Sequence, residues 1–168
     1  MLRPAPRHIW SILAAGALGL VTGSLVLTAW LDLHPCHLCI FQRLLYMILT
    51  VLALLAAWRS GRPGGIFAGL ISLPTAALGA GVAAYQSWLQ AQPPGTISCV
   101  GGQPGLIERL VEWMGQRLPE LFLATGFCEE AELTLLGLTL ANWSLIAFLA
   151  FLIAATWALA TQVRAPKL

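Results

Sequence analysis

The stretch that decides the fold runs from His34 to Trp58 and reads HPCHLCIFQRLLYMILTVLALLAAW. It opens with two cysteines, Cys36 and Cys39, and continues as an apolar run that contains one charge, Arg43. About 20 predominantly apolar residues are enough for a helix to cross a bilayer. The stretch therefore predicts a transmembrane helix over about 38–58, with reactive thiols where that helix begins.

Three further apolar stretches have a similar length, and we expect them to span a membrane at about 9–31, 66–89 and 141–163. Of the 168 residues, 58% are hydrophobic and only 10% are charged, whereas soluble domains carry about 25% charged residues. A cleaved signal peptide does not explain the first stretch, because it is too long and no small-residue cleavage site follows it. The sequence predicts an all-α membrane protein, a four-transmembrane-helix bundle in a single domain over 1–168.

The charges predict how this bundle is oriented. Six of the nine basic residues flank the first span, the connection between the second and third spans, or the end of the fourth: Arg3, Arg7, Arg59, Arg62, Arg164 and Lys167. All seven acidic residues fall in the other two connections, at about 32–37 and 90–140. The excess of Lys and Arg places both termini in the cytoplasm and these two loops outside.

All four cysteines, Cys36, Cys39, Cys99 and Cys128, fall on the predicted outer side. Cysteines in exported loops are typical of an oxidising compartment, and two structural disulfides are one interpretation of them. The three-residue spacing of the first two is instead that of dithiol redox pairs, and it is too short to staple much of a loop.

The surroundings of Cys39 favour a reactive thiol. Pro35 suits the first turn of a helix, and a helix N-terminus and a nearby cation both favour the ionised form of a thiol. Arg43 follows Cys39 by four residues and so lies on the same helical face. We expect this arginine either to snorkel toward lipid head groups or to face an anion, such as the Cys39 thiolate or the polar head of a cofactor. A thiol at this boundary can react with a molecule dissolved in the lipid.

A metal site is the other interpretation of the sequence HPCHLC. Its candidate ligands lie within six residues at a helix start: His34, Cys36, His37 and Cys39. Zinc sites usually combine separated pairs of ligands that can close a tetrahedron. The signature of c-type haem attachment needs a histidine directly after the second cysteine, where this chain has Ile40. We therefore expect neither a metal nor haem.

The long outer loop divides into a turn-rich part and a helical part. Residues 90–105 are rich in proline and glycine, so we expect Cys99 on a mobile loop that is open to attack by another protein's thiolate. In residues 106–118, helical spacing places the apolar side chains on one face and the charged side chains on the other. This pattern predicts a short amphipathic helix that lies at the membrane interface or packs on the spans. Cys128 precedes Glu129, Glu130 and Glu132, carboxylates that should oppose its ionisation.

The motifs around the cysteines resemble those of the DsbB family of bacterial disulfide bond formation proteins. The sequence PCHLCIFQR at 35–43 is similar to the family signature P-C-x-L-C-x-x-x-R at the start of the second span. SCVGG at 98–102 and ATGFCEEAELTLLGLTLANWSLIAF at 124–148 are similar to the second cysteine pair and to the run into the last helix. The resemblance covers nearly the whole chain.

The resemblance implies a thiol oxidase of the bacterial inner membrane that passes electrons to a quinone, either ubiquinone or menaquinone. Cys99 and Cys128 would oxidise a DsbA-like periplasmic protein, with Cys99 forming the mixed disulfide. Cys36 and Cys39 would be reoxidised by quinone, and Cys39 would be the thiolate beside the ring. Arg43 would stabilise that thiolate and the reduced quinone, and a transient Cys36–Cys128 bridge would connect the two pairs.

One departure from the family pattern concerns the third span. Some members carry a histidine near its outer end that is linked to the quinone site, but the histidines here are His8, His34 and His37. Gln86 or Tyr85 would have to take that place. Two alternatives stay open: a paralogue with the same chemistry that serves a dedicated client, and a noncatalytic membrane scaffold stapled by two disulfides.

Overall fold

The structure is a computed structural model that describes residues 6–93, 105–131 and 133–164. Four long helices dominate it: α1 (Pro6–Leu31), α2 (His37–Trp58), α3 (Pro63–Gln90) and α6 (Leu140–Arg164). Each is long and apolar enough to cross a membrane, and their bounds lie within three residues of the predicted spans. The predicted four-helix membrane fold is confirmed, and the chain is a multi-pass membrane protein.

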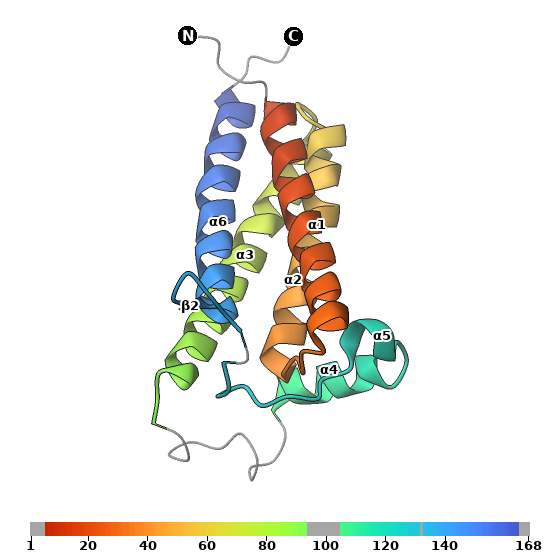
Figure 1. Ribbon diagram of the computed structural model, residues 1–168. Helices are drawn as coiled ribbons and strands as arrows, with labels where there is room; N and C mark the ends of the chain where they lie inside the picture. Colours follow the sequence, from red (N-terminus) through yellow and green to blue (C-terminus); the bar gives the residue numbers. More distant parts are fainter. Residues whose placement is uncertain (1–5, 94–104, 132, 165–168) are drawn as a thin grey trace.

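The four helices run alternately up and down the bundle (Figure 1). The start of α1, the connection from α2 to α3 and the end of α6 lie at one end of the bundle, and the start of α2 lies at the other end. The pairs α1 with α2, α2 with α3 and α3 with α6 pack extensively, whereas α1 and α6 contact each other less. This looser pair leaves room for a cavity at the end where α2 begins.

Helices α3 and α6 approach closely because α3 presents glycine to a ring of α6. A Cβ added at Gly79 would overlap the ring of Phe148, which is itself fully buried. Phe148 also stacks on Tyr46 of α2, with ring centroids 4.1 Å apart and an interplanar angle of 8°. Small residues commonly allow such close contacts between membrane helices.

The contact between α3 and α6 predicts that alanine substitutions at two glycines of α3 differ in their effect on stability. Gly79→Ala is expected to lower the free energy of unfolding by about 1–3 kcal/mol, because Phe148 has to leave its packed position. Gly81→Ala is the matched control, since a Cβ there meets nothing within 4 Å among the described residues. Thermal unfolding of the two variants in the same detergent measures the difference, and equal loss in both would contradict it.

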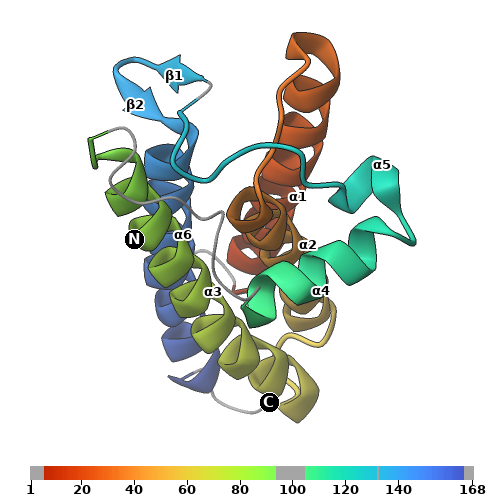
Figure 2. The same cartoon turned by 90° about the horizontal axis from the view of Figure 1, so that it is seen from below.

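The connection from α3 to α6 carries two short helices and a hairpin. They are α4 (Leu106–Gly115), α5 (Pro119–Phe122), and the antiparallel strands β1 (Thr134–Leu135) and β2 (Leu138–Thr139). The predicted amphipathic helix is present as α4, which ends three residues earlier than expected and lies across the end of the bundle where α2 begins (Figure 2). Val111 of α4 is buried while Leu106 and Trp113 remain exposed, so α4 packs on the bundle with one side only.

Candidate active site at the start of α2

Cys36 and Cys39 form a close dithiol because of how α2 begins. Cys36 is the N-cap residue, and its sulfur accepts a hydrogen bond from the backbone N–H of Cys39 at 3.4 Å. An N-cap side chain normally accepts from a backbone N–H two or three residues later, so the CxxC spacing turns a helix cap into a thiol pair. The two sulfurs are 3.2 Å apart and both cysteines are free thiols.

Cys128 reaches this dithiol through a segment that lies against the turn before α2. The backbone N–H groups of Thr125 and Gly126 both donate to the carbonyl of Pro35, at 3.0 and 3.3 Å. A Cβ at Gly126 would overlap the backbone oxygen of His34, so only glycine lets the two segments come this close. The result places the Cys128 thiol close enough to Cys36 for each to shift the pKa of the other, and both are buried.

The three thiols influence one another. Interactions with Cys128 and Cys39, together with burial, raise the pKa of the Cys36 thiol. The interaction with Cys36 lowers the pKa of the Cys128 thiol. The nearby Glu129 carboxylate opposes this effect, as its position in the sequence predicts, but it does not reverse it.

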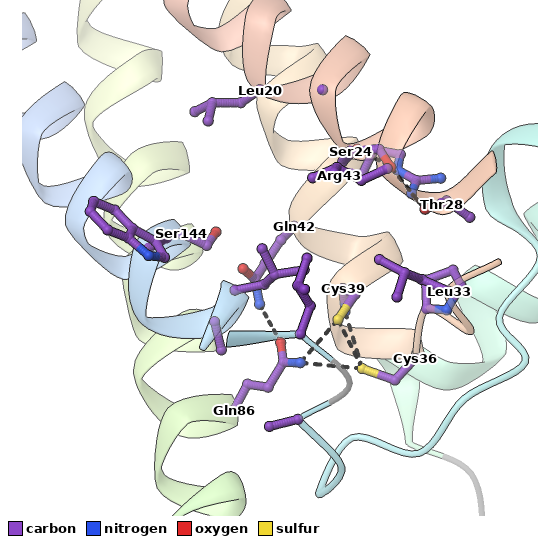
Figure 3. Close-up of a pocket in the computed structure, with 18 of the residues that line it drawn as sticks. Leu20, Ser24, Thr28, Leu33, Cys36, Cys39, Gln42, Arg43, Gln86 and Ser144 are labelled. Carbon is purple, nitrogen blue, oxygen red and sulfur yellow. Dashed lines mark hydrogen bonds between the residues drawn. The ribbon is translucent and has the colours of Figure 1, made fainter. Parts of the chain in front are cut away.

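Gln86 is the residue that α3 brings to the sulfurs. Its Nε2 lies 3.0 Å from Cys39 Sγ and 3.4 Å from Cys36 Sγ, and its Oε1 accepts from Gln42 Nε2 at 2.7 Å (Figure 3). Of the two third-span residues named from the sequence, only Gln86 occupies this place. Tyr85 is 52% exposed and stacks on Trp88 instead.

Arg43 points into the bundle and is only 6% exposed, so it does not snorkel outward. Its Nε donates to Ser24 Oγ at 3.0 Å, its Nη2 to Thr28 Oγ1 at 3.2 Å, and its Nη1 to the Leu121 carbonyl at 2.8 Å. A guanidinium has five N–H groups, so two of them have no partner among the described residues. Ser24 and Thr28 were not singled out from the sequence, although hydroxyls four residues apart in an uncharged span were a usable signal.

A cavity of about 280 Å³ brings these groups together. Cys36, Cys39 and Arg43 all line it, so the dithiol and the guanidinium face the same space. Its other walls come from α1, the turn before α2, α3, α6 and the segment before β1. Most of them are apolar: Leu20, Leu27, Leu33, Phe127, Leu133, Leu140 and Trp143. Gly19 and Gly23 also line it from α1, where the absence of a side chain keeps the space open. A mostly apolar cavity with a few convergent polar groups is typical of a small-molecule site.

The family model described as disulfide bond formation protein DsbB matches residues 6–158, which is nearly the whole chain. The chain belongs to the DsbB family. Its membership makes the protein a disulfide-forming oxidoreductase, in agreement with the family resemblance of its motifs.

Curated relatives named disulfide bond formation protein B are similar over most of their length. The protein of Dechloromonas aromatica is 44% identical over 144 residues, covering 85% of this chain and 86% of the relative. That of Paracidovorax citrulli is 32% identical over 166 residues, covering 99% and 92%. That of Methylobacillus flagellatus is 40% identical over 132 residues, covering 77% and 78%.

Two other sequence predictions concern this part of the DsbB-family chain. Cys99 lies outside the described residues, so its position relative to Cys128 is not described. The candidate metal ligands do not gather: no group of three or more His, Cys, Asp or Glu side chains that could hold a metal occurs within the described ranges. His37 instead faces α4, with its Nε2 3.8 Å from Glu112 Oε1.

Proposed function

We propose that this DsbB-family protein oxidises a DsbA-like periplasmic dithiol protein and passes the electrons to a membrane quinone. One observation carries the proposal: the Cys128 thiol lies near Cys36, Cys36 contacts Cys39, and this dithiol lines an apolar cavity that Arg43 also lines. The two loops that carry the cysteines face the periplasm of a bacterial inner membrane, and both termini face the cytoplasm. The distribution of basic residues and the family resemblance support this orientation.

The first exchange takes place at the outer pair. A thiolate of the partner attacks Cys99 of a Cys99–Cys128 disulfide, forms the mixed disulfide and releases Cys128. The partner's second thiol then attacks the partner's first sulfur, which is bonded to Cys99, and releases Cys99. The partner leaves with a disulfide, and Cys99 and Cys128 have gained two electrons and two protons.

The second exchange moves these electrons to α2. Cys128 attacks Cys36 of a Cys36–Cys39 disulfide, which forms the Cys36–Cys128 bridge and releases Cys39 as a thiolate. Cys99 then attacks Cys128, so the outer disulfide is restored and Cys36 is freed as a thiol. The closeness of the Cys36 and Cys128 thiols supports this route, because exchange requires direct access of one sulfur to the other.

The cavity fits a quinone by its chemistry. Its apolar walls suit a ring and its lipid tail, and the two N–H groups of Arg43 without a described partner suit a carbonyl oxygen. The Cys36–Cys39 dithiol would supply the two electrons and two protons that a quinone bound there would accept, and it would become a disulfide again. Arg43, which lines the same cavity, would stabilise the Cys39 thiolate, and the Cys36 thiol donates to Cys39.

A coupled assay tests the proposed function. Purified protein is given excess reduced DsbA-like partner and a soluble ubiquinone or menaquinone analogue, and quinone absorbance and partner thiols are followed together. We expect one quinone to be reduced for each partner disulfide formed, in many turnovers. Partner oxidation without quinone loss would contradict the proposal, and the rates with the two analogues would identify the preferred acceptor.

A further inference from the structure

Two amide side chains that face each other across α2 and α3 lie against the dithiol. Gln86 and Gln42 are 2% and 4% exposed, and both lie in helices long and apolar enough to span the membrane. A buried primary amide is costly unless its donors and acceptor are paired. Here the pairing includes the two sulfurs, which gives this amide pair a role beyond helix packing.

Gln42 determines which end of the Gln86 amide faces the sulfurs. Because Gln42 Nε2 donates to Gln86 Oε1 at 2.7 Å, the oxygen of Gln86 is occupied and its NH₂ group turns toward Cys39 and Cys36. The opposite orientation would bring the amide oxygen against an electron-rich sulfur. A thiolate can only accept hydrogen bonds, so this orientation matters most when one of the two sulfurs is ionised.

We propose that Gln86, oriented by Gln42, is a positioning residue that donates to the Cys39 thiolate and so directs the negative charge of the dithiol to Cys39. The distance from Gln86 Nε2 is shorter to Cys39 Sγ than to Cys36 Sγ, 3.0 against 3.4 Å, which favours charge on Cys39. Cys36 supports the same choice, since its thiol donates to Cys39 Sγ at 3.2 Å. The inference rests on the proposed function, in which Cys39 faces the electron acceptor.

The role of Gln86 differs from that of Arg43. The three hydrogen bonds of Arg43 go to α1 and to the Leu121 carbonyl, so it contributes charge to the cavity. Gln86 contributes a directed donor to the sulfurs, and an amide does not titrate, so that donor is the same at every pH. The other titratable or charged side chains on this cavity are His34, Arg43, Tyr46, Glu130 and the thiols, and no variant below alters any of them.

The test measures the reactivity of Cys39 in the fully reduced protein, with neither quinone nor partner present. Iodoacetamide labels the thiols at several pH values between about 5 and 9, and fragment masses distinguish Cys39 from Cys36. In Gln86→Met, which keeps the length but lacks the donor, we expect Cys39 labelling near neutral pH to fall about tenfold, as for loss of a hydrogen bond to a charged group. The pH profile of the labelling should move to higher pH, and the preference for Cys39 over Cys36 should shrink.

Gln42→Met provides a second variant that leaves Gln86 in place and adds no charge. Without the Gln42 donor, the Gln86 amide is no longer held with its NH₂ group toward the sulfurs, so Cys39 labelling should fall, though by less than in Gln86→Met. Tyr85→Phe is the matched control, because Tyr85 precedes Gln86 on α3 but is 52% exposed and does not line the cavity.

An unchanged Cys39 profile in both Gln86→Met and Gln42→Met would overturn the inference, as would an equal change in Tyr85→Phe. Since the labelling needs no acceptor, its result does not depend on the coupled assay. Failure of the parent protein to reduce quinone would overturn the proposed function alone.

Discussion

Cys39→Ser is expected to lower steady-state, quinone-coupled oxidation of the partner by at least about a thousandfold, as for removal of a nucleophile from a catalytic unit. Cys39 is the sulfur that combines contact with Cys36, a hydrogen bond from Gln86 and a place on the cavity wall. A serine hydroxyl cannot form a disulfide with Cys36, so no electron pair can leave through the cavity. The coupled assay measures the loss.

A single-turnover version of the assay serves as the control for Cys39→Ser. The outer pair keeps its disulfide in this variant, so about one equivalent of partner should still be oxidised before the reaction stops. The same single equivalent would show that the protein is folded and that exchange at the outer loop is intact. Sustained turnover at the parental rate would contradict the role of Cys39.

Arg43→Gln is expected to lower kcat/KM for the quinone by about ten- to a hundredfold, the range for removing a charged hydrogen-bonding group from a buried site. Glutamine can keep one contact to Ser24 or Thr28 but has no charge, so both the acceptor and the Cys39 thiolate lose stabilisation. Arg43→Lys keeps the charge but lacks the planar guanidinium that reaches three acceptors. Its kcat/KM for the quinone should lie between those of the parent protein and Arg43→Gln. Assays at several quinone concentrations measure these changes.

The Arg43 variants also need a stability control, because the arginine links α2 to α1 and to the Leu121 carbonyl. Thermal unfolding in detergent reports that contribution separately from catalysis. Arg59→Gln, at the other end of α2, removes a cation without touching the cavity and should keep parental kinetics. Parental kcat/KM in Arg43→Gln would show that its charge does not act on the acceptor.

The fold was largely predictable because its signals are local. An apolar run of sufficient length predicts a membrane span whatever surrounds it, and the four helices begin and end within three residues of the predicted bounds. The helix over 106–115 was equally readable from its alternating faces. The small hairpin over 134–139 was not predicted, because its two-residue strands are too short to show any periodicity.

The candidate site was predictable only in the part that lies on one helix. The spacing of Cys36, Cys39 and Arg43 on α2 places all three on the same cavity, as expected from helical geometry. The direction taken by Arg43 was left open between lipid and an anion, and the structure shows a third solution in which hydroxyls of α1 and a backbone carbonyl hold it. That solution depends on how α1 is rotated against α2, which no local pattern encodes.

The sequence alone determines the four spans, the clustering of charge at their ends and the reactive pair at the start of α2. The free-energy cost of placing a side chain in lipid or in water depends mainly on that residue and its helical neighbours, so these features are local. The tertiary structure alone decided that Gln86, 47 residues from Cys39, faces the sulfurs while Tyr85 faces outward. It also decided that Cys128 lies near Cys36 and that glycines of α1 leave a cavity open. These contacts arise from the packing and rotation of whole helices, where neighbours in space are remote in the chain.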